Sequence, residues 1–186
     1  MNFNTYTTLF KDIIDGTNAT APYDDPHYVE YVKLNASRQN RWMKTGVLST
    51  ELISSIEQIK EEQNWLLITE PWCGDASHNV PFIEKMAELN PKIKLVIQLR
   101  DATNSEIDNY LTNGGKSIPI LVVRNTKNED LFVWGPRPSV CQEIFLEMKN
   151  NNLPLDEQKI ILQNWYNDDK GVSIQKELNK LISANL

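Results

Sequence analysis

The sequence has few of the residues that mark several common protein classes. Its 186 residues include only two cysteines and two histidines, too few for a disulfide scaffold or for zinc-ligand spacing, so we expect no metal site. No run of about 18 apolar residues occurs, so we expect no transmembrane helix and no membrane partner. The first residues, from Met1 to Tyr6, lack the basic and apolar stretches of a secretory signal. We therefore expect a cytoplasmic, reducing environment.

An excess of positive charge is also missing. The chain has 19 Lys and Arg against 25 Asp and Glu, a formal net charge of −6, and the basic residues are scattered among acidic ones. Proteins that bind nucleic acids normally carry a basic face, so no nucleic-acid partner is expected. The segment Gly114-Gly115-Lys116 lacks the spacing and the following helix of a phosphate-binding loop.

What is present is an ordinary globular composition, 40% hydrophobic and 24% charged, which suits one domain with additions. Apolar residues at helical spacing, together with capping residues, predict most of the helices. Short apolar runs without polar breaks predict buried strands. The expected helices are 3–14, 26–46, one starting at Ser49, 74–89 with Pro81 inside it, 103–111, one capped by Ser139 and ending at 150, 155–167 and 172–184. The expected strands are 65–69, 93–99, 117–123 and 131–134, the last two forming a hairpin.

Strands that alternate with helices predict an α/β fold, with a central mixed β-sheet flanked by helices. We divide the chain into an N-terminal helical extension (1–48), a central domain (49–150) and a C-terminal helical extension (151–186).

The strongest candidate site is Cys73, which lies at a turn between a buried strand and a helix, in Trp72-Cys73-Gly74-Asp75-Ala76. The first N–H groups of a helix are unpaired and carry partial positive charge. A thiolate is stabilised there, and the thiolate is the nucleophilic form of cysteine. Gly74 leaves room for a partner's backbone beside the sulfur, and Trp72 offers a flat apolar surface. The alternative is a small buried residue at a turn.

This turn resembles the Trp-Cys-x-x-Cys active-site turn of the thioredoxin family. Pro81 resembles the proline that kinks the family's active-site helix. Ile118-Pro119 resembles its cis-proline strand start, and Gly135 matches a glycine before the last helix. The resemblance covers about residues 49–150 and implies a thioredoxin-like fold. It also implies Cys73 as the catalytic residue, with Trp72, Gly74, Asp75, Ile118, Pro119 and Gly135 lining a substrate groove.

Two departures from the family pattern bear on the function. Ala76 stands where a resolving cysteine would be, so Cys73 would need an outside thiol to leave a mixed disulfide. Leu67 stands where thioredoxins carry a buried carboxylate that accepts a proton in the missing step. An engineered Cys-to-Ala change at position 76 would explain the first departure but not the second.

Three other residues bear on the chemistry of Cys73. Asp75 stabilises the first helical turn but opposes a thiolate nearby, so its net effect on Cys73 is left open. We expect His78 to be a lone surface residue rather than a partner of Cys73. Cys141 belongs to an apolar helical stripe, and we expect a core residue rather than a disulfide partner.

Two functions compete at this point. The first, which we favour from the sequence, is a monothiol thiol-disulfide exchange or redox-sensing protein without a bound cofactor. Its partners would be protein or peptide thiols or disulfides, with glutathione as a co-substrate. It requires a depressed Cys73 pKa. The second is a non-catalytic thioredoxin-fold module that binds a peptide or protein, and it allows an ordinary or raised pKa. A dithiol reductase is disfavoured by Ala76.

Overall fold

The computed structural model describes residues 1–186 and begins with three helices whose ends are set by local capping. Helix α1 (Phe3–Ile14) follows Asn2, whose side chain accepts a hydrogen bond from the backbone N–H of Thr5. Helix α2 (Pro26–Thr45) starts at a proline after Asp25, and helix α3 (Thr50–Glu57) is capped by Ser49. Proline suits a first helical position because the N–H that it lacks has no partner there. The three helices agree with the sequence prediction.

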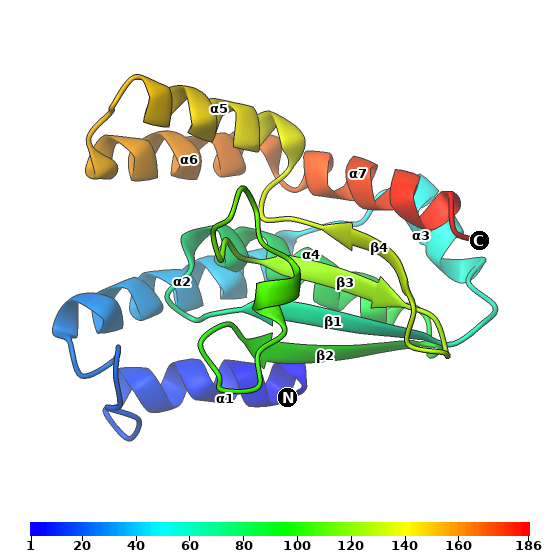
Figure 1. Ribbon diagram of the computed structural model, residues 1–186, viewed down its shortest axis with the longest axis horizontal. Helices are drawn as coiled ribbons and strands as arrows, with labels where there is room; N and C mark the ends of the chain where they lie inside the picture. The colour runs from blue at the N-terminus through cyan, green and yellow to red at the C-terminus, as the bar shows by residue number, and fades with distance from the viewer.

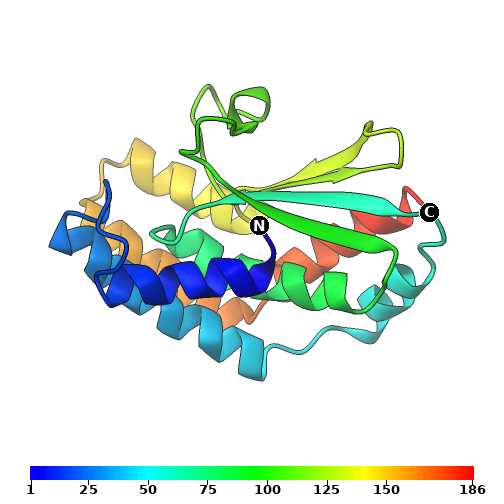
Figure 2. The ribbon, with the colours of Figure 1, turned by 90° about the horizontal axis from the view of Figure 1, so that it is seen from below.

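The central sheet has four strands in the order β2-β1-β3-β4. Strands β1 (Gln63–Thr69) and β2 (Ile93–Leu99) are parallel and are joined through helix α4 (Gly74–Glu88). Strand β3 (Ile120–Arg124) runs antiparallel to β1 and forms a hairpin with β4 (Asp130–Trp134). The mixed sheet and the hairpin are therefore as predicted. Helices α1, α2, α4 and α7 lie on one side of the sheet, while the segment 100–119 rises from the other side (Figure 2).

The segment between β2 and β3 differs from the prediction. The expected helix over 103–111 is replaced by irregular backbone and one short 3₁₀ turn, η1 (Ile107–Asn109). The Gln98 side chain accepts from the Glu106 N–H at 2.8 Å and donates to the Asn104 carbonyl at 3.1 Å. The Glu106 carboxylate pairs with Arg124 at 2.6 Å. The N–H and the carboxylate of Glu106, which a capping box would have used, are therefore bonded to residues of β2 and β3 instead.

The C-terminal part consists of α5 (Ser139–Asn150), α6 (Leu155–Asp169) and α7 (Val172–Ser183). The predicted cap of α5 is wrong, because the helix starts after Pro138. The Ser139 hydroxyl donates to Glu177 of α7 at 2.6 Å instead. Helices α5 and α6 lie side by side, and α7 continues past the edge of the sheet toward α3 (Figure 1).

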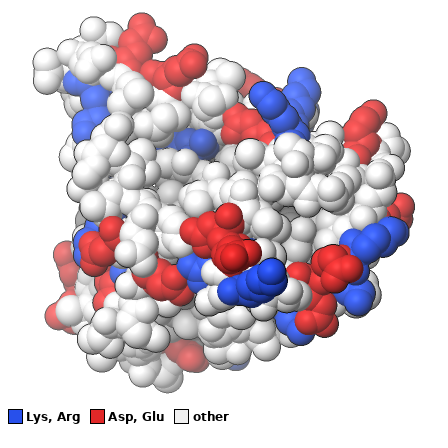
Figure 3. All heavy atoms as spheres, turned by 45° about the vertical axis from the view of Figure 1, so that its right-hand side comes forward, with Lys and Arg blue, Asp and Glu red and all other residues white.

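The hydrophobic core is one cluster of 32 buried residues that crosses the predicted boundaries at 48 and 150. Tyr6 and Val32 enter it from the N-terminal helices, and Leu178 and Ile182 enter it from α7. These terminal helices are therefore part of the core. None of the helices combines the length and apolar character that crossing a bilayer requires. Acidic and basic side chains lie interspersed over the face drawn in Figure 3.

Candidate functional site

Cys73 is the N-cap residue of α4, directly after the strand β1 and its short turn. Its Sγ accepts a hydrogen bond from the Ala76 N–H at 3.5 Å, and the thiol donates to the Ile118 carbonyl at 3.4 Å. The peptide bond between Ile118 and Pro119 is cis. Cys73 is only 6% exposed, so the turn presents a covered thiol, although the sequence placed it correctly at a helix start.

The environment of Cys73 favours the neutral thiol. Burial, helped by the negative charge of Asp75, raises the pKa of Cys73 to about 12, although the Ala76 N–H and Arg137 act in the opposite direction. Desolvation disfavours a buried thiolate more strongly than one helix N–H stabilises it. The thiol is therefore protonated at neutral pH in this conformation.

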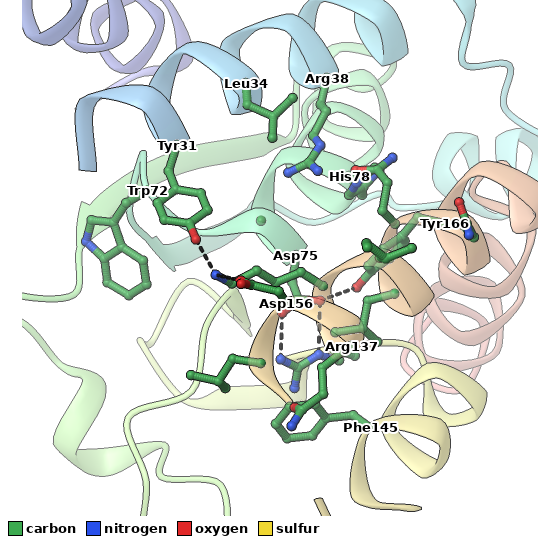
Figure 4. Close-up of a pocket in the computed structure, with 18 of the residues that line it drawn as sticks. Tyr31, Leu34, Arg38, Trp72, Asp75, His78, Arg137, Phe145, Asp156 and Tyr166 are labelled. Atoms are coloured by element: carbon green, nitrogen blue, oxygen red, sulfur yellow. Dashed lines mark hydrogen bonds and ion pairs between the residues drawn. The ribbon is translucent and has the colours of Figure 1, made fainter. Parts of the chain in front are cut away.

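Asp75 connects the turn to the C-terminal helices. Its carboxylate pairs with Arg137 Nη2 at 2.6 Å and accepts a second bond from Arg137 Nε at 3.0 Å. The hydroxyl of Tyr166, on α6, donates to the same carboxylate at 2.9 Å. Figure 4 shows these side chains converging on Asp75. Both side chains of the ion pair are 12% exposed, and the Arg137 guanidinium also lies 4.0 Å from the centre of the Phe145 ring.

A buried carboxylate also lies at the start of the turn, at a position that the sequence analysis did not single out. Glu70 is 3% exposed, and it accepts from the Tyr23 hydroxyl at 3.2 Å and from the Asp101 N–H at 3.0 Å. Burial raises the pKa of Glu70. Leu67, in contrast, is fully buried in the apolar core. Glu70 ties the end of β1 to the segment before α2 and to the end of β2.

His78 is buried rather than on the surface, which corrects the sequence expectation. Trp42 Nε1 donates to His78 Nδ1 at 2.9 Å, so Nε2 carries the proton and donates to Gln163 at 3.3 Å. The imidazole stacks on the Tyr166 ring at 4.3 Å. Burial lowers the pKa of His78 to about 3, so the ring is neutral. Helix α6, whose packing was not predictable from local pattern, covers it.

The other residues singled out from the sequence are tightly packed or covered by neighbouring side chains. Gly135 has φ of +126°, and a Cβ there would lie 2.2 Å from the Pro119 carbonyl oxygen, so only glycine fits between the two segments. The half-buried Trp72 is covered by the Arg100 guanidinium, 4.6 Å from its ring centre. Cys141 is fully buried, as expected, and both cysteines are free thiols.

A cavity of about 730 Å³ adjoins the turn, between α2, the start of α4 and α6. Three of the seven predicted site residues line it, namely Trp72, Gly74 and Asp75, whereas Cys73, Ile118, Pro119 and Gly135 do not. The other main lining residues are Tyr28, Tyr31, Leu34, Arg38, His78, Arg137, Phe145, Leu155, Asp156, Lys159, Ile160, Gln163 and Tyr166. The helix α6 was predicted from the sequence, but the placement of α6 and Arg38 at this cavity was not, because their contacts are distant along the chain.

Comparison with known proteins identifies the family. A family model described as thioredoxin matches residues 23–152, which is 130 of the 186 residues. The chain belongs to the thioredoxin family. The matched range begins before α2, so in this thioredoxin-family protein α2 lies within the family region although the sequence analysis assigned it to an extension.

Solved structures show the same fold. A protein of unknown function from Pseudomonas aeruginosa, PA1234, aligns with a TM-score of 0.59 and 16% identity, over 84% of this chain and 86% of that one. An HIV epitope-scaffold aligns with a TM-score of 0.58 and 16% identity, over 99% of both chains. No curated protein matches the sequence.

Proposed function

We propose that this thioredoxin-family protein is a non-catalytic binding module whose ligand occupies the cavity beside the Cys73 turn. The observation that carries the proposal is the set of contacts that Arg137 and Tyr166 make with the Asp75 carboxylate, which we call the clamp on Asp75. Arg137 and Tyr166 hold the C-terminal helices against the first turn of α4 and so form one side of the cavity. A cavity of this volume, with aromatic walls and a few polar groups, is typical of small-molecule sites.

The state of the thiol supports binding over catalysis. Cys73 is buried and hydrogen-bonded, and its pKa is raised. Ala76 supplies no second thiol, and the clamp places the carboxylate of Asp75 close enough to oppose thiolate formation. Each of these features works against a nucleophile, whereas none of them hinders ligand binding in the adjoining cavity.

Monothiol exchange is the second candidate, and one observation favours it. The Sγ accepts the Ala76 N–H at the start of a 15-residue helix, which is the contact that would stabilise a thiolate. In this reading the Cys73 thiolate would attack a disulfide of a protein, a peptide or oxidised glutathione. An S–S bond would form to Cys73, the original S–S bond would break, and one thiolate would leave.

The rate of Cys73 alkylation as a function of pH distinguishes the two functions. In the Cys141→Ser variant, which leaves one thiol, we expect slow alkylation with a midpoint above the free-thiol value of about 8.5, because the sulfur is buried. Fast alkylation with a midpoint well below that value would replace the binding proposal with the monothiol one. Under the binding proposal, ligand affinity also survives Cys73→Ser.

A further inference from the structure

Among the charged side chains that line the cavity, one cation has no carboxylate partner. Of its acidic side chains, Asp75 pairs with Arg137, and Asp156 pairs with Lys159 at 3.0 Å. His78 is neutral. Arg38 lines the cavity and forms no salt bridge. The lining therefore carries a net charge of about +1, located on Arg38.

Hydrogen bonds through Asn35 to the turn before α4 hold the Arg38 side chain in place. Its Nη1 donates to Asn35 Oδ1 at 2.9 Å, and the buried Asn35 amide donates in turn to the Pro71 carbonyl at 3.0 Å. Nη1 also lies close to Gly74, only 3.7 Å from where a Cβ would be. This single side-chain hydrogen bond leaves the other N–H groups of the guanidinium without protein partners. In Figure 4 the guanidinium points from α2 into the space between Tyr31 and His78.

The rest of the cavity suits an apolar body. Tyr28, Tyr31, Trp72 and Phe145 contribute aromatic surface. Leu34, Leu155 and Ile160, which also line the cavity, are 47%, 72% and 61% exposed. Exposed aliphatic side chains gathered at a cavity favour an apolar ligand over a hydrated one.

We infer that the cavity binds an organic monocarboxylate with an apolar or aromatic body, its carboxylate held by Arg38. This rests on the proposed binding function. A guanidinium pairs with a carboxylate through two parallel hydrogen bonds, which suits the free N–H groups of Arg38. A dianion such as a phosphate monoester fits less well, because a second negative charge would face Asp75 and Asp156 with no further free cation.

The test uses three matched probes, 2-naphthoate, 2-naphthamide and 2-naphthyl phosphate, titrated by calorimetry and by NMR shifts of the cavity residues. We expect 2-naphthoate to bind the native protein tightest. Arg38→Gln should weaken 2-naphthoate about tenfold or more and 2-naphthamide less than about twofold, because only the anion forms charge-assisted bonds. Lys44→Gln removes the same charge from an exposed position of α2 and should leave all three affinities unchanged.

The outcomes separate the two proposals. If all probes bind and Arg38→Gln weakens none selectively, the binding function stands and the role of Arg38 is wrong. If 2-naphthyl phosphate binds tightest, the monocarboxylate assignment is wrong. If no probe shifts the cavity residues of the native protein, both proposals fail. Arg38→Lys checks folding effects, since it keeps the charge and should retain part of the preference for the anion.

Discussion

Asp75 has two effects at the scale of a single residue. Its charge helps to raise the pKa of Cys73, and its carboxylate is the partner of the buried Arg137. Asp75→Asn should therefore lower the Cys73 pKa while it destabilises the fold by roughly 3 kcal/mol, because the largely buried Arg137 guanidinium loses its only carboxylate partner. Urea unfolding and alkylation of the variant measure the two effects.

The matched control for Asp75 is Asp156→Asn, which removes a carboxylate that is 91% exposed and pairs with Lys159 across one helical turn. Such pairs contribute less than about 0.5 kcal/mol. Equal destabilisation by the two variants would show that the Asp75 ion pair does not hold the C-terminal helices on the turn.

His78 gives the protein a defined pH dependence. Because burial lowers its pKa to about 3, the unfolded chain binds a proton below about pH 6.5 that the folded chain does not, so stability falls as the pH falls from 6.5 toward 3. Glu84, whose pKa burial raises to about 7, acts in the opposite direction between about pH 4.5 and 7. The His78 contribution must therefore be measured as a difference between variants.

Between pH 7 and pH 5, the native protein should lose roughly 2 kcal/mol more stability than His78→Gln, measured by urea unfolding at each pH. His27→Gln, which keeps the buried imidazole and changes an exposed one, should behave like the native protein. Parallel pH profiles for the native protein and His78→Gln would contradict a neutral, buried His78.

At the scale of elements, the turn between α6 and α7 is pressed against α4. A Cβ on Gly171 would lie 2.2 Å from Phe82 Cζ, and Gly171 also has φ of +78°. Gly114 has the same φ but nothing within 4 Å of its Cβ position. Gly114→Ala should cost roughly 1 kcal/mol from backbone strain alone, and Gly171→Ala should cost about 2 kcal/mol more. Chemical denaturation of the two variants compares them, and equal costs would argue against close docking of this turn.

Elements were predictable from the sequence where their signals are local. Asp25-Pro26 and Ser49 mark helix starts by capping geometry, and the apolar run from Trp65 to Thr69 marks a buried strand. The helix expected at 103–111 failed because Gln98 and Arg124, which belong to strands, bind its polar groups. Local pattern cannot show such competition.

The candidate site divides in the same way. The position of Cys73 at a helix start followed from its neighbours in the sequence. Its burial did not, because the thiol bonds to Ile118, 45 residues further along the chain, and the partners of Asp75 lie 62 and 91 residues further along, at Arg137 and Tyr166. Arg38 likewise becomes part of the candidate site only because α2 packs beside the turn. The sequence could locate the turn but not the residues packed around it.

At the scale of the whole molecule, the single core predicts one cooperative folding unit. Val32 and Trp42 from α2, and Leu178 and Ile182 from α7, are all buried in the cluster that also contains the sheet. Deleting a helix removes these side chains and exposes the apolar surface they covered, at roughly 25 cal/mol for each Å². A domain is stable by only about 5–15 kcal/mol, so the loss of several buried side chains exceeds the margin.

We therefore expect the fragment 49–150 not to fold alone, although it contains all four strands and α4. Its amide NMR spectrum should show narrow dispersion and its thermal melt no cooperative transition. The fragment 1–150, which restores α1 and α2 but lacks α7, should also fall short of a native spectrum, because Leu178 and Ile182 are still missing. A well-dispersed spectrum from 49–150 would mean that the terminal helices are additions to a self-sufficient domain. The cavity would then be a feature added to that domain and not one built into its core.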